Sequence, residues 1–150
     1  MAPGPRPVFA SLTESESAAL LARNHVARVA FIVDGEPDIE PIAYAYADGW
    51  IYGRTSPGAK LNALLHSPWV AIEIDEVTGP NDWRCVVVHG TVYFVSADSV
   101  GVERQGYEHA LEHLRALDRH VLDENDAVPH RRHIFRIHCD RVSGRSATSG

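Results

Sequence analysis

Residues 51–65 read IYGRTSPGAKLNALL and place a short apolar strand, a polar loop and a helix in direct succession. The loop carries Arg54, Thr55 and Ser56, and Lys60 falls in the first turn of the helix. Helix-start amides, hydroxyl groups and cations are donors with which proteins bind phosphate. The stretch therefore predicts a strand that ends in a phosphate-binding turn, followed by a helix that stops before Pro68.

The residues on either side of this stretch carry strand and hairpin signals. Asp34-Gly35 and Asp48-Gly49 each follow a run of β-branched or aromatic residues, and such pairs favour two-residue hairpin turns. Alternating apolar residues continue further along the chain, with a bend expected at Gly90. We expect strands over residues 26–33, 39–47, 50–53, 69–77, 83–96 and 133–142.

Helices are expected only as connections between these strands. Thr13 and Glu16 form a capping-box pattern that starts a helix ending near Asn24. A second helix covers about residues 58–66, and a third runs from Asp98 or Ser99 to about residue 122. Six or so strands with short hairpin spacing predict a mainly β fold, a small antiparallel barrel with peripheral helices. A doubly wound parallel sheet fits less well, because no Gly-x-Gly-x-x-Gly opens a helix.

The composition limits the kinds of protein that this chain can be. With 150 residues, 45% of them hydrophobic, we expect a single domain over residues 1–150, with a proline-rich loose arm over residues 1–11. A net charge of −6 argues against nucleic acid or an anionic membrane as the main partner. No membrane span or secretory signal is evident, and Cys85 and Cys139 are expected to be buried free thiols. A cytoplasmic protein is the simplest interpretation.

A second candidate binding segment is DWRCVVVHG, residues 82–90, in which Trp83 and Arg84 open a long strand. An aromatic ring and a cation beside a phosphate turn indicate a flat, phosphorylated cofactor. Trp83 could equally anchor the strand in the core. Because neighbouring strand residues point to opposite faces, Trp83 and Arg84 reach one pocket only if the strand edge is twisted.

The chain contains nine histidines, a residue type that can bind a metal ion or a haem iron. His109 and His113 have the four-residue spacing at which two imidazoles can share a metal, but no third ligand is evident. An exposed helix face is the simpler interpretation. His89 and His138 could ligate a haem iron, although each also fits an ordinary strand position. We predict no metal site, and no Ser-His-Asp or Cys-His set identifies catalytic residues.

Taken in order, VARVAF, EPIAYAY, WIYGRTSPGAKLNALL, DWRCVVVHGTV and FRIHCDRVSGR resemble the pyridoxamine 5′-phosphate oxidase-like flavoproteins, and among them the nitroimidazole-resistance-type subgroup. The resemblance covers about residues 20–146 and rests on the order and spacing of these blocks. It implies a split β-barrel that forms a homodimer, with flavin mononucleotide (FMN) in the crevice between the subunits.

The resemblance also assigns residues to this cofactor. Lys60 matches the phosphate-binding lysine of the family, and Thr55 and Ser56 match its hydroxyl contacts. The remaining implied contacts are Gly53 and Arg54 beside the phosphate, Pro41, Ile42 and Ala43 along the isoalloxazine ring, and Trp83 and Arg84 on the long strand.

The chain departs from the family at several positions. Many pyridoxamine phosphate oxidases have an arginine where this chain has Glu40-Pro41, and another where it has Ala59. Nitroimidazole-resistance proteins often have a histidine near Gly53, which this chain lacks. Oxidation of vitamin B6 and nitroreduction are therefore unsupported. The resemblance implies an FMN-dependent oxidoreductase acting on an unidentified small molecule. Haem, deazaflavin or FAD binding, or a flavin-binding module without turnover, are the alternatives.

Overall fold

The structure is a computed structural model that describes Gly4 and residues 6–149. In this part of the chain, eight antiparallel strands form one sheet, accompanied by three helices. The elements are β1 (Pro7–Ser11), α1 (Glu14–Arg23), β2 (Val26–Val33), β3 (Glu36–Ala43), β4 (Ala45–Ala47), β5 (Trp50–Thr55), α2 (Ala59–His66), β6 (Trp69–Gly79), β7 (Asp82–Val95), α3 (Val102–Leu117) and β8 (His133–Ser149).

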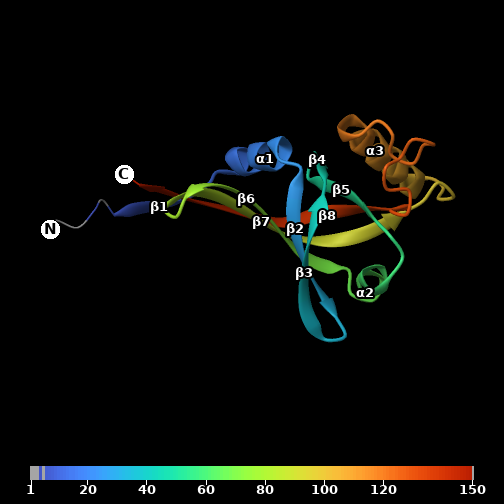
Figure 1. Cartoon of the computed structure of the whole chain (residues 1–150), viewed down its shortest axis with the longest axis horizontal. Coiled ribbons are helices and arrows are strands. Elements are labelled where there is room, and N and C mark those ends of the chain that lie inside the picture. The colour runs from blue at the N-terminus through green and yellow to red at the C-terminus, as the bar shows by residue number, and fades with distance from the viewer. Residues whose placement is uncertain (1–3, 5, 150) are drawn as a thin grey trace.

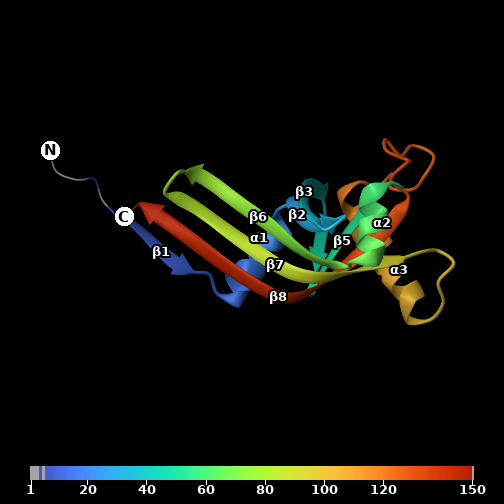
Figure 2. The same ribbon diagram turned by 90° about the horizontal axis from the view of Figure 1, so that it is seen from below.

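The sheet follows the order β3-β2-β6-β7-β8-β5-β4, and β1 pairs with the far end of β8. Strand β8 thus pairs with three others, β7, β5 and β1. Figures 1 and 2 show β6, β7 and β8 running on as a long arm, with β1 alongside and α2 and α3 at the other end of the molecule. This is the split β-barrel that the sequence predicted, with the helices outside the sheet.

Both predicted hairpin turns are present. Asp34 and Gly35 have φ values of 51° and 78°, and Asp48 and Gly49 have φ values of 49° and 82°. Two successive residues with positive φ define the turn type that matches the right-handed twist of paired strands. The first turn joins β2 to β3 and the second joins β4 to β5.

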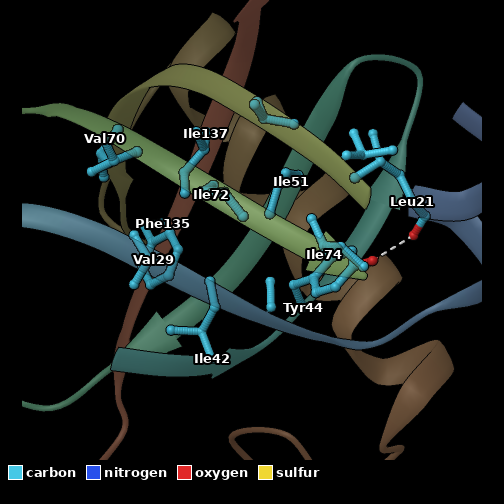
Figure 3. Close-up of a cluster of buried hydrophobic side chains, with 14 of the residues drawn as sticks. Leu21, Val29, Ile42, Tyr44, Ile51, Val70, Ile72, Ile74, Phe135 and Ile137 are labelled. Atoms are coloured by element: carbon cyan, nitrogen blue, oxygen red, sulfur yellow. Dashed lines mark hydrogen bonds between the residues drawn. The ribbon is translucent and has the colours of Figure 1, made fainter. Parts of the chain in front are cut away.

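The core fills the interior of the barrel, as Figure 3 shows. Ile72 and Ile74 of β6 are almost fully buried, and Ile51 and Ile137 face them from other strands. Tyr44 is also completely buried, and its hydroxyl donates a 2.7 Å hydrogen bond to the carbonyl oxygen of Leu21. Burial raises the pKa of Tyr44 far above its usual value, so this hydroxyl remains a donor.

Tyr44 also explains why the expected strand over residues 39–47 is divided in two. Its backbone amide donates to the carbonyl of His25, 3.0 Å away, at the point between β3 and β4. Strand β3 pairs with β2, whereas β4 pairs with β5, so the chain passes from one side of the barrel to the other at this residue. Alternation alone did not reveal this corner, because the sequence pattern continues across it.

Strands extend closer to both ends of the chain than the sequence predicted. Residues 7–11 are not a loose arm but strand β1, which pairs with residues 145–149 of β8. The polar residues after 142 likewise continue β8 to Ser149. Residues 1–3 and 5 of the expected arm lie outside the described residues. Residues 143–149 are mostly small and polar, and they continue the strand because their backbone groups pair with those of neighbouring strands.

The capping box at Thr13 and Glu16 is confirmed. The Thr13 hydroxyl accepts from the Glu16 amide at 3.1 Å, and the Glu16 carboxylate accepts from the Thr13 amide at 3.0 Å. At the other end of α1, Arg23 donates two hydrogen bonds, 2.6 and 2.8 Å long, to the Glu76 carboxylate on β6. These contacts tie α1 to the sheet.

We expect Glu76 to make folding stability sensitive to acid. Hydrogen bonds from Arg23 and Asn24 lower the pKa of Glu76 from 4.5 to about 2. A lowered native pKa means that the stabilisation is present above 4.5 and is lost as the pH falls from 4.5 towards 2. The free energy of unfolding, measured in urea as a function of pH, should fall less steeply in this pH window for Glu76→Gln than for the wild type. The same pH dependence of the unfolding free energy for both proteins would show that Glu76 is not the group responsible.

No helix in the described part of the chain is long and apolar enough to cross a membrane.

Candidate functional site

A cavity of about 320 Å³ lies where β3, the end of β5, α2 and α3 meet. Its volume falls within the range of small-molecule sites in proteins. One wall comes from β3 and β5, and the opposite wall from the end of α3 and the loop that follows it. The lining residues are Glu40, Pro41, Ile42, Ala43, Arg54, Thr55, Ser56, Lys60, Leu114, Leu117, Asp118, Val121, Val128 and Arg131.

The phosphate-binding turn predicted from the sequence forms part of this cavity. Thr55 ends β5, Ser56 follows it, and Lys60 lies in the first turn of α2, as expected. Gly58 precedes the helix with a φ of 152° and provides no side-chain cap. The first amides of α2 are therefore open to an external acceptor, which is the arrangement that an anion requires.

Lys60 is more enclosed than a lysine on a solvated surface. Only 17% of its side chain is exposed, and its ammonium lies 3.0 Å from the Glu40 carboxylate. The ammonium also lies 5.9 Å from the centre of the Phe31 ring. The sequence placed Lys60 at a helix start that disfavours cations, and Glu40 supplies the negative charge that offsets this position.

Arg54 holds the far wall of the cavity in place. Its guanidinium donates two hydrogen bonds, of 2.6 and 3.0 Å, to Asp126 in the loop between α3 and β8. The Asp126 side chain is 1% exposed and also accepts from the amides of Leu122 and Val128. Hydrogen bonds from Arg54 hold the pKa of Asp126 far below its usual range. Arg54 thus bonds to a carboxylate of this chain, and it positions the loop.

The sequence did not identify this second wall. Asp118, Val121, Val128 and Arg131 lie in or beside a polar loop without a recognisable motif. Their place in the cavity depends on Asp126, whose partner Arg54 is 72 residues away in the sequence. To predict this part of the cavity, one would have to know which acidic residue pairs with Arg54. The loop contains several acidic residues, and the sequence does not distinguish among them.

Pro41, Ile42 and Ala43 are brought to the same cavity, along strand β3. Ile42 is buried, whereas Ala43 is exposed. They form a largely apolar edge beside the polar turn, and Leu114 and Leu117 of α3 add a second apolar part to the lining. A flat ring can lie between two such apolar edges, with its polar group at the start of α2.

Gly53, the remaining predicted residue of this segment, is buried and does not line the cavity. A Cβ atom at this position would lie 2.6 Å from Cζ of Phe135, a ring that is itself buried. Such a distance is shorter than a van der Waals contact. Gly53 is therefore required by the packing of β5 against Phe135.

Trp83 and Arg84 lie away from the cavity of their own chain, at the end of the arm. Trp83 pairs with Val77 on one side and Ala147 on the other, and its ring lies 6.4 Å from that of Phe9. Arg84 is exposed on the opposite face of β7. Both nevertheless line one hollow at the end of the arm, together with Glu76 and Asp82, and this hollow is separate from the cavity.

The other candidate groups also lie outside the cavity. His113 stacks on Tyr52 at 5.1 Å, and His138 bonds to Asp140 at 2.6 Å. Among the described residues, no group of three or more histidine, cysteine or acidic side chains is arranged to hold a metal. Both cysteines are free thiols, as expected, but each is half-buried where the sequence predicted full burial; desolvation raises the pKa of Cys85 to about 12.

Comparison with known proteins agrees with this architecture. A family model described as pyridoxamine 5′-phosphate oxidase matches residues 13–146. The crystal structure of an FAD-binding protein from Mesorhizobium loti is 30% identical, with 94% of this chain and 99% of that chain covered and a TM-score of 0.75. A candidate 5-nitroimidazole antibiotic resistance protein from Bacteroides thetaiotaomicron shares the fold, at 15% identity, with coverage of 95% and 89% and a TM-score of 0.70.

Among curated proteins, an uncharacterized protein from Rhizobium meliloti is 32% identical over 79 residues, or 53% of this chain. The aligned part spans about half of that relative, 52% of its length. The family model and the FAD-binding protein, by contrast, extend over nearly the whole chain. Together with the split barrel, these matches show that the chain belongs to the pyridoxamine 5′-phosphate oxidase family.

Proposed function

We propose that this protein binds FMN in the cavity between β3, α2 and α3, and that it is an oxidoreductase acting on a small molecule. The observation that carries the proposal is the convergence of Thr55, Ser56 and Lys60 at the uncapped start of α2. A similar fold in an FAD-binding protein, at 30% identity, supports a flavin as the ligand class.

The cavity residues fit the two chemically different halves of a flavin nucleotide. Lys60, the hydroxyls of Thr55 and Ser56 and the first amides of α2 would hold the phosphate. Pro41, Ile42 and Ala43 would lie along one edge of the ring system, with the Leu114 and Leu117 side chains opposite. Such apolar walls exclude water from the ring, while a few polar groups fix its orientation.

A bound flavin would supply the redox chemistry, and the protein would supply binding and orientation. No dedicated acid or base is needed for a hydride transfer, so we assign no catalytic residue. Arg54 would act indirectly, because its bond to Asp126 keeps the loop residues Val121 and Val128 against the cavity.

The experiment is a titration of the purified protein with FMN, followed by flavin fluorescence and absorption. We expect saturable binding, with riboflavin weaker because it lacks the phosphate. FAD, a deazaflavin and haem are titrated in parallel. Preference for one of them, or a Soret band lost on changing His89 or His138, would replace FMN in the proposal. If no flavin binds at excess ligand, the proposal of a flavin-binding protein is wrong. Reduction of the bound flavin without reoxidation by any acceptor would indicate a module without turnover.

We further propose that the protein is a homodimer. The row formed by Phe9, Trp83 and Val77 supports this, because these apolar residues lie in register across β1, β8, β7 and β6, with Ala147 of β8 between Phe9 and Trp83. Phe9 is 68% exposed and Val77 is 63% exposed. Exposed apolar surface of this kind is typical of interaction sites. A second copy packed on the arm could also bring Trp83 or Arg84 towards the cavity of its neighbour.

The dimer is tested by sedimentation velocity at micromolar concentration. We expect the mass of two chains for the wild type and dissociation towards one chain for Phe9→Asp, since a charge is costly in an apolar interface. Val100→Asp is the matched control, because Val100 is 83% exposed and lies away from the arm. A monomeric wild-type protein would contradict the proposal.

A further inference from the structure

We propose that Glu40 makes the phosphate site selective for charge. Its carboxylate is the resident counter-ion of Lys60, and a ligand must carry a doubly charged anionic group to displace it. This inference rests on the proposed function, because it concerns the ligand class that the same site accepts. The inference gives a role to Glu40, whose negative charge would otherwise be unexpected in a cavity proposed to bind phosphate.

The ion pair joins two elements across the cavity. Glu40 is on β3, where it pairs with Val29 of β2, and Lys60 is on α2. Their charged atoms are 3.0 Å apart, and both side chains line the cavity. Lys60 therefore already has an anionic partner at the place where a ligand phosphate would bind.

A second cation of the cavity is neutralised in the same way. Arg54 is paired with Asp126, so two of the three cationic lining residues have a carboxylate from this chain. The third, Arg131, makes no ion pair within 4 Å in the described part of the chain. Without a ligand, the cavity thus has much less excess positive charge than its three cations suggest.

This arrangement discriminates between anions by their charge. A tethered carboxylate has a high effective concentration, in the millimolar range or above, so a free monocarboxylate that replaces it gains nothing. A phosphate monoester carries nearly two negative charges and three acceptor oxygens. It can bond to Lys60 and at the same time accept from the first amides of α2. The gain from these additional bonds is what displaces Glu40.

Glu40 has room to leave Lys60. Its side chain is 44% exposed, whereas that of Lys60 is 17% exposed, so the carboxylate can turn towards solvent while the ammonium stays. The two negative groups cannot both remain beside Lys60 without repulsion. Displacement of Glu40 therefore reduces the net binding energy of the phosphate.

The first test is the affinity of Glu40→Gln for FMN and for riboflavin. We expect FMN to bind about tenfold more tightly, because a competing like charge has been removed, and riboflavin to bind as it does to the wild type. Glu36→Gln is the matched control, since it removes the same charge from the same strand at an exposed position outside the cavity. Unchanged or weaker FMN binding by Glu40→Gln would overturn the inference.

The second test separates displacement from simple repulsion. In a Lys60→Ala background, Glu40→Gln should improve FMN binding less than it does in the wild type, because there is no ammonium left to compete for. An equal improvement in both backgrounds would show that Glu40 acts only through space, and the counter-ion assignment would be wrong.

A third measurement keeps the inference testable without a flavin. Thermal unfolding is followed with inorganic phosphate or acetate at constant ionic strength. The wild type should be stabilised by phosphate and not by acetate, whereas Glu40→Gln should respond to both. Equal responses of the wild type to both anions would overturn the charge selectivity. If no variant binds flavin but this pattern holds, the proposed function fails and the selectivity of the site stands.

Discussion

Replacing Lys60 with alanine should weaken FMN binding roughly ten- to hundredfold, which corresponds to about 1.5–3 kcal/mol for a charge-assisted hydrogen bond. Riboflavin affinity should change little, because the contact is to the phosphate. The measurement is a fluorescence titration of both proteins with both ligands. Equal affinity of the two proteins for FMN would place the phosphate elsewhere.

The sequence allows a direct check of the same contact. Lys60 is the only lysine among the 150 residues, so an amine-selective reagent modifies this side chain and the chain's first amino group alone. Bound FMN should protect Lys60 from acetylation, as measured by mass spectrometry of the peptide that contains it. Riboflavin should protect it less. Equal modification with and without FMN would contradict the assignment, whatever the affinities.

The stability cost of Lys60→Ala should be small but measurable. A fully solvated lysine would contribute almost nothing, but only 17% of this side chain is exposed and its ammonium pairs with Glu40. Truncation removes the packing of its methylene groups as well as the ion pair. We expect the melting temperature of the ligand-free protein to fall in Lys60→Ala. It should fall much less in Lys60→Arg.

Replacing Gly53 with alanine should destabilise the fold by about 1–3 kcal/mol, the usual cost of overpacking a core. The new methyl group would lie 2.6 Å from Cζ of Phe135. That ring is buried and packs edge-on against Phe94, so it cannot move away freely. For a protein of this size, the melting temperature should fall by roughly 2–4 °C per kcal/mol, measured by calorimetry.

Two further variants identify the cause. Gly79→Ala is the control, because its added Cβ would meet Asp82 only at an ordinary distance of 3.7 Å. Combining Gly53→Ala with Phe135→Leu should cost less than the sum of the two single changes, since the smaller side chain leaves space for the methyl group. If Gly53→Ala instead weakens FMN binding without any loss of stability, Gly53 contacts the cofactor and the packing explanation is wrong.

Local signals in the sequence were sufficient for most of the fold. The Asp-Gly pairs at 34–35 and 48–49 and the capping box at Thr13 describe interactions between residues close in the chain, and all three are present. Strand β1 carried no such signal. It exists because residues 145–149 offer it a backbone partner, and pairing across more than 130 positions leaves no local pattern.

For the candidate site too, the sequence predicted the residues that are close together in the chain and missed the contacts between distant ones. Thr55, Ser56 and Lys60 follow one another closely, so a local motif contained them. Asp126 and Glu40 were not predicted as partners of Arg54 and Lys60, because these contacts form only when the fold brings β3 to α2 and the loop before β8 to β5. Trp83 fits the family pattern of a cofactor contact, yet within one chain it belongs to the arm.

The position of β8 has a consequence for the order in which the protein can form. This strand is made after the other seven described strands, from residue 133 onwards, yet it lies between β7 and β5 and also pairs with β1. A nascent chain that lacks it leaves three strands with unpaired edges, and such edges promote association between molecules. We expect folding to be slow, because its contacts join distant parts of the chain. Fragments that end before residue 133 should aggregate. Chaperones that bind exposed strands should slow this aggregation.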